Sequence, residues 1–388
     1  MPPACTAPSA CAWASEPWAG SEVSAAASDH AHMRRALALA RRGWGRTAPN
    51  PMVGAVVVRG GRVVGEGWHA RYGEDHAEVV ALRAAGEAAR GATLYVTLEP
   101  CAHHGRTPPC VDAVLRAGIR RVVAAVRDPN PQAAGGLARL AAHGVEVESG
   151  VEAAAAMELD APFFFRFVSD RPWVTLKLAL SLDGALADHT RWPGWLTGPR
   201  SRREVHRLRA GSDAVAVGVG TALTDDPALT VRGVRAPRVA PTRVVFDRSA
   251  RLPLDSRLVR TAREVPVVVV TGEPAPAPAI ALADAGVGIL PAPSLHEALR
   301  RLAAQGVRNI FVEGGSGLTG ALMAGDLVDR LIIFQAPLIL GTGALPAFGA
   351  APATTADAAA RLRIVRRRAF GDDLMTEYAL TELAPRMP

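Results

Sequence analysis

Residues 76–110 read HAEVVALRAAGEAARGATLYVTLEPCAHHGRTPPC, and this stretch decides the fold class because it holds three typical zinc ligands. An imidazole from His76 and thiolates from Cys101 and Cys110 are donors that zinc prefers, and three protein ligands leave a fourth position for water. Zinc lowers the pKa of such a water toward neutrality. Two core cysteines near a chance histidine are the less favoured explanation. We therefore predict a catalytic zinc site at His76, Cys101 and Cys110.

Glu78 follows the predicted histidine ligand by two residues. A carboxylate at this position can move protons without binding the metal, and His-x-Glu with Pro-Cys is the arrangement of zinc-dependent nucleobase deaminases. Residues two apart on a regular helix point about 200° apart. His76 and Glu78 can therefore face one site only at the irregular first turn of a helix, and residues 73–75 (GED) supply such a start. The pattern predicts Glu78 as the catalytic residue.

The two cysteines are unusually far apart. Eight residues separate Cys101 from Cys110, whereas the generic deaminase signature has two. A Gly-, Arg-, Thr- and Pro-containing loop of this length can reach over a substrate. His103 and His104 lie on it and are competing ligand candidates, which we rank as substrate-facing or structural.

Strands and helices alternate on both sides of the motif, which is typical of an α/β sandwich. The spacing of apolar residues and turns predicts a hairpin that Arg59–Arg62 closes and a first helix that Ser28-Asp29 caps. The elements expected in this half are 28–43, 53–58, 63–64, 76–90, 93–98, 109–117, 121–126, 136–143 and 145–147.

A second α/β pattern follows a helix expected over 152–167. The polar, Pro-containing joint at residues 169–172 (SDRP) is the best domain boundary. The strands expected beyond it are 173–180, 214–219, 242–246, 267–270, 309–312 and 331–334, with helices at 200–209, 294–304 and 318–324.

Composition narrows the class of protein. The 388 residues suggest two to three domains, and the 49% hydrophobic content with a net charge of +7 indicates a globular protein. No stretch approaches the roughly 20 apolar residues of a membrane span. Lysine occurs once, at Lys177, among many arginines. The four cysteines indicate a reducing compartment, and residues 1–28 lack the basic start of a secretory signal, so we expect a cytoplasmic protein.

The motifs resemble those of the bifunctional riboflavin-biosynthesis deaminase-reductases from about Asp29 to Glu382. The matching strings are PNPMVG (49–54), GEGWH (65–69) and the 76–110 stretch with its long cysteine spacing. The resemblance implies an N-terminal cytidine-deaminase-like α/β/α sandwich and a C-terminal dihydrofolate-reductase-like α/β domain. The implied division is a disordered extension at 1–28, a deaminase domain at 29–150, a connecting helix and linker at 151–172, and a reductase domain at 173–384.

The resemblance also implies a substrate and its contacts in the first domain. The substrate would be 2,5-diamino-6-(5-phosphoribosylamino)pyrimidin-4(3H)-one, which loses its 2-amino group as ammonia. The family's zinc ligands fall on His76, Cys101 and Cys110, and its proton-moving carboxylate falls on Glu78. Asn50 and His69 fall near the substrate, and each could equally fix a loop by a hydrogen bond.

The second half carries a glycine-rich turn, VEGGSGL (312–318), between a strand and a helix. Backbone N–H groups there can approach a phosphate, although a plain strand-to-helix turn is an equal alternative. Its neighbours KLALSLDG (177–184), WLT (195–197) and TALTDDPALTVR (221–232) resemble the family's NADPH-dependent reductase half. The resemblance places at the cofactor Ala179, Trp195, Thr221, Asp225, Gly315, Ser316, Gly317, Leu318, Thr319, Gly320 and Ala321, and at the substrate Arg209, Leu229, Arg232 and Glu313.

Three further expectations concern this second half. Lys177 is the single lysine, and a compact ammonium differs from a planar guanidinium, so we expect an electrostatic role beside the substrate or cofactor. The guanidinium groups of Arg209 and Arg232 suit a ribose 5-phosphate. Asp225 could position the nicotinamide or a proton, or it could belong to an ordinary turn.

The sequence departs from the family pattern at two places, and two other functions are less favoured. Pro193 stands where the family has Ser, and the stretch at 134–136 (AGG) is one residue shorter. The runner-up is a zinc deaminase whose C-terminal half only binds a nucleotide. An RNA-binding module is disfavoured because arginines are dispersed and aromatic residues are few. We expect a small-molecule substrate, no nucleic-acid or membrane partner, and self-association.

Overall fold

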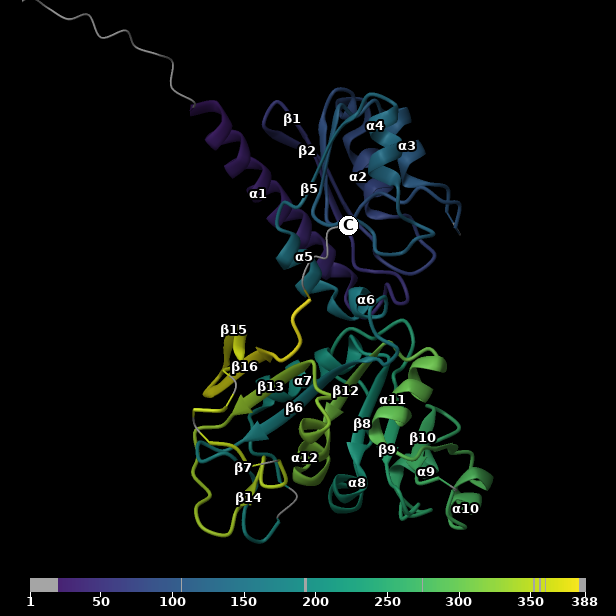
Figure 1. The fold of residues 1–388 in the computed structure, drawn as a ribbon, viewed down its shortest axis with the longest axis vertical. Coiled ribbons are helices and arrows are strands. Elements are labelled where there is room, and N and C mark those ends of the chain that lie inside the picture. Colours follow the sequence, from purple (N-terminus) through teal and green to yellow (C-terminus); the bar gives the residue numbers. More distant parts are fainter. Residues whose placement is uncertain are drawn as a thin grey trace, which may run out of the picture.

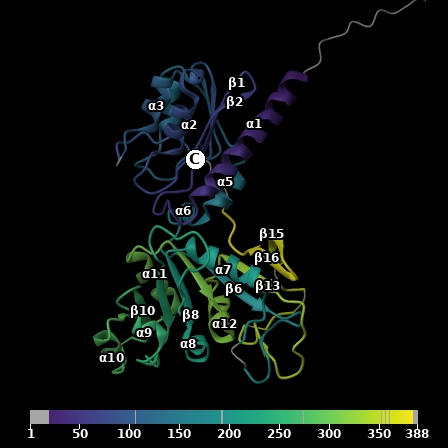
Figure 2. The same cartoon turned by 180° about the vertical axis from the view of Figure 1, so that it is seen from behind.

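The computed structural model describes residues 20–383, except 106, 192–193, 274, 352, 356 and 360, with side chains from residue 27 onward. Two α/β lobes, each built on its own sheet, are stacked along the long axis (Figure 1). Figure 2 shows the same division from behind. Within the described residues, no helix is long and apolar enough to cross a membrane.

The first lobe is built on a five-stranded sheet in the order β2-β1-β3-β4-β5. β1 pairs antiparallel with β2 and β3, whereas β3, β4 and β5 run parallel. The hairpin turns through Gly60 (φ 56°) and Gly61 (φ 75°), in the left-handed backbone that two-residue hairpin loops need. The hairpin prediction is therefore confirmed. The strands are β1 Gly54–Arg59, β2 Arg62–Trp68, β3 Thr93–Val96, β4 Arg121–Ala124 and β5 Glu146–Ser149.

Helices cover both faces of this sheet. α2, α3 and α4 pack on one face through side chains such as Leu82, Val114 and Leu140. α1 and α5 pack on the other through Met33 and Ala156. The lobe is the predicted α/β/α sandwich. Its helices are α1 Gly20–Ala40, α2 Ala77–Ala85, α3 Cys110–Ala117, α4 Gly136–Ala142 and α5 Ala153–Leu159, with short 3-10 turns at Arg41–Gly43 and Gly86–Ala89.

The N-terminal boundary differs from the expectation. α1 begins at Gly20, ahead of the predicted cap at Ser28. Ala25, Ala26 and Ala27 are strong helix formers and continue the helix backwards. Residues 20–28, which were assigned to a disordered extension, are therefore helical, and residues 1–19 lie outside the described residues.

The connecting segment is two short helices rather than one. α5 ends at Leu159, and α6 (Ala161–Phe165) follows after Asp160 with a proline at its start. A proline in the first turn of a helix is tolerated, but within a continuous helix it removes a hydrogen bond and clashes with the preceding turn. Pro162 therefore accounts for the break.

The second lobe is built on a nine-stranded sheet in the order β11-β10-β9-β8-β12-β6-β13-β16-β15. The strands from β11 to β13 run parallel, and β16 and β15 continue antiparallel. The strands are β6 Trp173–Leu180, β8 Ala214–Gly218, β9 Thr242–Phe246, β10 Val267–Thr271, β11 Gly288–Pro291, β12 Asn309–Glu313, β13 Arg330–Gln335, β15 Arg363–Phe370 and β16 Asp373–Ala379; β7 Ala185–Ala187 and β14 Leu345–Pro346 form a small separate sheet.

Apolar clusters lie on both faces of this sheet. Leu299 and Leu302 of α11 pack on one face with Leu322 of α12. α7, α8, α9 and α10 supply the other face, for example through Leu208 and Leu258. The helices are α7 Pro199–Ala210, α8 Val219–Asp225, α9 Arg257–Arg260, α10 Ala279–Asp284, α11 Leu295–Ala304 and α12 Ser316–Ala324.

Candidate active sites

Three metal-ligating side chains converge in the first lobe, where two helices begin. His76 is the N-cap of α2, with extended backbone (φ −71°, ψ 159°), and Cys110 is the first residue of α3. Cys101 lies on the loop that follows β3. Their ligand atoms all lie within 4.8 Å of one another, and His76 Nδ1 is 3.2 Å from Cys110 Sγ. The three predicted ligands are thus brought together.

Hydrogen bonds inside this cluster favour a thiolate. The Cys110 thiol and the His76 imidazole lower the pKa of Cys101 to about 4. The bond to Cys101 raises the pKa of His76 to about 9, and the same sulfur together with burial raises the pKa of Cys110. A divalent cation held between these donors would stabilise both thiolates. The His-Cys-Cys set therefore fits a zinc ion.

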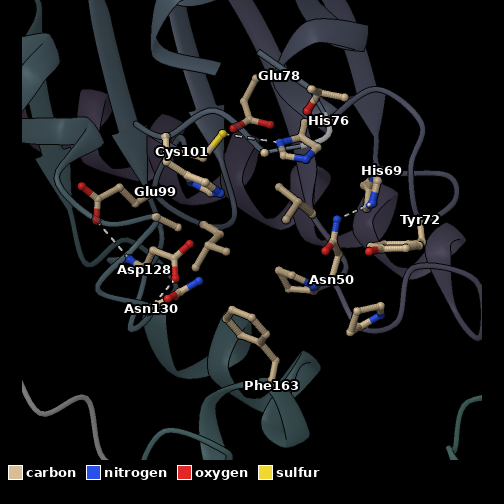
Figure 3. A pocket seen from close by; sticks show the side chains of 18 of the residues that line it. Asn50, His69, Tyr72, His76, Glu78, Glu99, Cys101, Asp128, Asn130 and Phe163 are labelled. Atoms are coloured by element: carbon tan, nitrogen blue, oxygen red, sulfur yellow. Dashed lines mark hydrogen bonds between the residues drawn. The ribbon is translucent and has the colours of Figure 1, made fainter. Parts of the chain in front are cut away.

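Glu78 lies beside the cluster, in the first turn of α2. His76 is outside the regular helix, so the two side chains converge as the spacing required, and Figure 3 shows the Glu78 carboxylate beside the imidazole and Cys101. The residue is only 3% exposed, and burial raises the pKa of its carboxyl to about 7. A group with this pKa can accept and return a proton near neutral pH.

A pocket of about 420 Å³ extends from this cluster to α6, where Phe163 lies at the far end (Figure 3). Asn50 and His69 form one wall, with Asn50 Nδ2 3.2 Å from His69 Nε2. His69 Nδ1 lies 3.1 Å from the carbonyl oxygen of Asp75, which only accepts. His69 therefore donates from Nδ1 and accepts from the Asn50 amide. Both predicted residues line the pocket, and their hydrogen bonds also fix the loop.

The opposite wall contains carboxylates that sequence reasoning missed. Glu99 is 6% exposed and accepts the backbone N–H groups of Asp128 (3.0 Å) and Leu137 (2.9 Å). Asp128 in turn accepts the N–H of Asn130, and burial raises the pKa of its carboxyl to about 6. The position of Asp128 in the sequence could have indicated its role. It belongs to the DPNP turn (128–131), which follows β4, and polar residues after parallel strands gather at one edge of a sheet.

The shortened stretch at 134–136 packs directly behind the cysteine loop. Gly135 adopts φ 91°, and a Cβ on Gly136 would lie 1.8 Å from the carbonyl oxygen of Pro100. Only glycine fits there, so the stretch supports Cys101 from behind. His103 lines the pocket without ligating the cluster, and His104 is exposed.

A second cluster of charged side chains lies in the other lobe, where β6 and β12 end. Lys177 and Glu313 are paired residues of these strands. Arg209, from α7, donates Nε–H to Glu313 at 2.5 Å and Nη1–H to the carbonyl oxygen of Thr230 at 2.9 Å. Burial lowers the pKa of Lys177 and raises the pKa of Asp225, and the two charges attract each other. Four predicted reductase residues, Lys177, Arg209, Asp225 and Glu313, therefore share one electrostatic environment.

The glycine-rich turn leads into the start of α12. Gly315 is its N-cap, and a Cβ at this position would lie 2.8 Å from Thr221 Oγ1, whereas Gly317 faces open space. Thr319 is fully buried and Gly320 packs against the backbone of Ala350. The predicted segment from Gly315 to Ala321 therefore has an accessible start next to Thr221, a buried pair, Thr319 and Gly320, that packs the helix against the lobe, and an exposed last residue, Ala321.

The remaining predicted reductase residues differ in accessibility. Trp195 is 65% exposed, with the Arg202 guanidinium 5.3 Å from its ring centroid. Ala179 is half-buried on β6, and Leu229 is buried at φ 51°. Arg232 is exposed, and its backbone N–H donates to His206 Nδ1. Pro193 lies outside the described residues.

The two lobes match two family models. The model of the cytidine and deoxycytidylate deaminase zinc-binding region matches residues 26–126, and the model of the RibD C-terminal domain matches residues 172–376. Fold and sites thus define the class: a zinc-binding deaminase domain joined to a reductase domain.

Relatives cover both domains. The riboflavin biosynthesis protein RibD of Aquifex aeolicus is 43% identical over 316 residues, which are 81% of this chain and 88% of the relative. RibD of Escherichia coli is 44% identical over 328 residues, 81% and 89% of the two chains. The structure of Acinetobacter baumannii RibD superposes with a TM-score of 0.81 at 37% identity, covering 92% of this chain and 100% of the other.

The chain belongs to the RibD family and is a bifunctional riboflavin biosynthesis enzyme, a deaminase and a reductase. The family resemblance drawn from the motifs is confirmed. A deaminase with a merely nucleotide-binding second half is not favoured, since the relatives extend over both domains.

Proposed function

We propose that the first domain hydrolyses 2,5-diamino-6-(5-phosphoribosylamino)pyrimidin-4(3H)-one at its 2-amino group, releasing ammonia. The second domain then reduces the ribosyl group with NADPH to give 5-amino-6-(5-phosphoribitylamino)uracil. A Thermotoga maritima structure with a TM-score of 0.80 and 35% identity, which covers 92% of this chain and 99% of its own, is described as a diaminohydroxyphosphoribosylaminopyrimidine deaminase and 5-amino-6-(5-phosphoribosylamino)uracil reductase. The observation that carries the proposal is the pocket that joins Glu78 to the His-Cys-Cys cluster.

His76, Cys101 and Cys110 would hold one zinc ion per chain, which would supply a Lewis acid that makes water a better nucleophile. Glu78 takes the proton from the attacking water and delivers it to the departing nitrogen. Its raised pKa, about 7, suits both transfers. The overall exchange is balanced: water enters, the carbon–nitrogen bond breaks, and ammonia leaves. Such a general acid-base group typically contributes 10²–10⁴-fold to a rate.

Asn50 and His69 orient the pyrimidine in the pocket. The Asn50 side chain gives one amide hydrogen to His69, which leaves its carbonyl oxygen as an acceptor. His69 is 2% exposed and is fixed by the carbonyl of Asp75. The pair therefore presents a fixed set of polar atoms to the ring.

In the second domain, NADPH would supply hydride, and the accessible glycines at the start of α12 fit its phosphates because backbone N–H groups can approach there. Lys177 stabilises negative charge beside the reacting sugar, and the Glu313 carboxylate attracts that ammonium. Arg209 is 5% exposed and is committed to Glu313 and Thr230. The exposed Arg232 is therefore the better partner for the sugar phosphate.

The test is a paired assay on the diaminopyrimidine ribosyl phosphate, following ammonia release and NADPH oxidation on zinc-assayed protein. We expect ammonia first and NADPH loss second, with about one zinc per chain. Cys101→Ser should lower the zinc content and ammonia release together, and a serine–cysteine change at an exposed position, Ser249→Cys, should change neither. Ammonia without NADPH loss would refute the reductase half, and neither activity in zinc-loaded protein would refute the substrate.

A further inference from the structure

A second hollow, with a volume of about 310 Å³, lies at the junction of the two lobes. The hollow is lined by residues that follow α6 and by residues of α11, and Figure 1 and Figure 2 both show these two helices at the junction. We call it the junction groove. Four of the eight side chains that line it are arginines, which come from the connecting segment and the second lobe. The lining residues are Arg166, Ser169, Asp170, Arg171, Arg300, Ala303, Ala304 and Arg308.

Two of these arginines are neutralised by carboxylates. Arg171 forms a two-bond pair with the buried Asp329, at 2.6 and 2.9 Å. Arg300 pairs with Asp170 at 2.7 Å and with Glu297 at 2.9 Å. Asp170 is the one carboxylate among the lining residues, and its charge is already paired with Arg300. These two cations hold the linker and α11 in place and are not free to bind an anion.

The other two arginines have no such partner. Within residues 20–383 as described, neither Arg166 nor Arg308 forms an ion pair. Arg166 lies over the rings of Phe163 and Phe167, each 4.6 Å from its guanidinium carbon, and donates weakly to the Pro49 carbonyl at 3.4 Å. Burial lowers the pKa of Arg166, the nearby positive charge of Arg308 lowers it further, and the Asp128 carboxylate, which forms no ion pair with Arg166, partly opposes both.

Arg308 is exposed and keeps most of its donors available. Its Nη1 donates to the carbonyl oxygen of Ala303 at 3.3 Å, while its backbone N–H donates to Asp213 at 2.8 Å. The Asp213 carboxylate also accepts the N–H of Asn309, so backbone groups occupy it. Two guanidinium groups with unused donors thus share one hollow, which costs free energy unless an anion lies between them.

Arg166 also lines the deaminase pocket, together with Glu78 and Asn50. The pocket and the junction groove therefore share a wall at this side chain. A ligand whose ring lies at Glu78 would extend toward α6, because Phe163 and Arg166 form that end of the pocket. A phosphate on the far end of such a ligand would meet guanidinium donors, which match phosphate oxygens in pairs.

We propose that the junction groove binds a phosphomonoester through the guanidinium groups of Arg166 and Arg308. The occupant is the 5-phosphate of the deaminase substrate, so the inference rests on the proposed function and extends it. It assigns to the linker and to the second lobe a part in substrate binding by the first. Arg308 belongs to the reductase domain, which makes that domain a contributor to the affinity of the deaminase.

Direct binding tests the groove without any reaction. The full-length chain with Arg232→Gln, which removes the proposed phosphate partner of the reductase site, serves as the parent and is titrated calorimetrically with ribose 5-phosphate, and with ribose as the uncharged control. We expect Arg166→Gln and Arg308→Gln each to weaken ribose 5-phosphate binding about tenfold, the loss of one charge-assisted contact, while ribose binding does not change. The exposed Arg260→Gln serves as the matched control. Binding by both variants that equals the parent's would overturn the proposal.

Deaminase kinetics identify the source of the phosphate. For the phosphorylated substrate, Arg308→Gln should raise KM about tenfold with kcat unchanged; for its dephosphorylated form, KM should stay as in the parent. Weaker ribose 5-phosphate binding with an unchanged KM would support the groove but overturn the substrate as its occupant. If the parent does not deaminate the diaminopyrimidine at all, the proposed function is wrong. The titration would still show whether the junction groove binds a phosphomonoester.

Discussion

At the residue scale, the deaminase site depends on backbone geometry as much as on residue type. His76 occupies the N-cap, so its imidazole leaves the helix at a different angle from the side chain of Glu78, two residues later in the first turn. The residue types of the metal ligands and the two-residue spacing of His76 and Glu78 could be recognised in the sequence, because neither requires knowledge of the fold. Glu99 could not, since its importance comes from hydrogen bonds to backbone groups distant in the chain. Asp128 had only the weaker signal of its position after β4.

Lys177 provides a residue-scale prediction. Arginine in its place would set two guanidinium groups, with Arg209, around the single carboxylate of Glu313. A planar fork also needs more room than an ammonium. We expect Lys177→Arg to lower kcat/KM of the reductase at least tenfold, about 1.4 kcal/mol of transition-state stabilisation, with deamination unchanged. NADPH oxidation measured on the deaminated intermediate checks this. A rate within twofold of the parent, equal to that of the exposed Arg203→Lys control, would contradict it.

At the element scale, two glycines of β2 allow α2 to pack closely against the sheet. A Cβ on Gly67 would lie 2.4 Å from the carbonyl oxygen of Ala77, and one on Gly65 would lie 2.3 Å from that of Ala81. Backbone cannot move aside as a flexible side chain can. The GEGWH string therefore matters because α2, which presents His76 and Glu78, rests on its glycines.

Gly67→Ala tests this seating. The added methyl group should push the first turn of α2 outward and separate the metal ligands, because overpacking a tight contact costs about 1–3 kcal/mol. We expect at least a tenfold loss of ammonia release together with reduced zinc content. Reduction of the deaminated intermediate should persist. Gly220→Ala, where an added Cβ meets open space and the backbone is not left-handed, is the comparison. Full zinc content and activity in Gly67→Ala would show that α2 does not depend on the glycine.

The junction of α5 and α6 yields a prediction about pH. Asp160 accepts the N–H of Met52 at 3.1 Å, and burial raises the pKa of its carboxyl from 3.8 to about 7. A raised pKa contributes stability that is full below the unfolded value and is lost as pH rises through the folded one. Asp160→Asn keeps the acceptor but cannot ionise.

The stability gain of Asp160→Asn over the parent should therefore grow between pH 5 and pH 8, by roughly 2 kcal/mol. Urea unfolding at both pH values measures it, with the exposed Asp284→Asn as the control. A gain that shrinks as pH rises would mean that the native carboxylate is stabilised rather than penalised.

Most strands and helices could be predicted from sequence because their apolar periodicity is local. β15 could not, since RIVRRRAF carries four arginines and lies at the sheet edge, where charged residues are tolerated. α8 was missed for another reason: Val219 and Ala222 are its buried residues, which is too short an apolar pattern to distinguish a helix. The break at Asp160 had a local signal in Pro162, which the single helix expected over 152–167 did not take into account.

At the scale of the whole molecule, the lobes are joined by side chains as well as by the linker. Trp44 of the first lobe donates to the carbonyl oxygen of Arg207 at 2.8 Å, and Arg238 of the second donates to that of Ala48 at 2.9 Å. The Arg238 contact is at the rim of the deaminase pocket, next to Pro49. Deaminase and reductase are therefore physically coupled, while their reacting groups belong to different sheets.

The most direct test of two sequential reactions in separate sites is Glu78→Gln supplied with each substrate in turn. From the diaminopyrimidine, we expect ammonia release and NADPH oxidation to fall together by at least 10²-fold, because reduction waits for deamination. From the deaminated intermediate, NADPH oxidation should match the parent at equal zinc content. NADPH oxidation that persists with the diaminopyrimidine, or that fails with the intermediate, would contradict the division of labour between the two lobes.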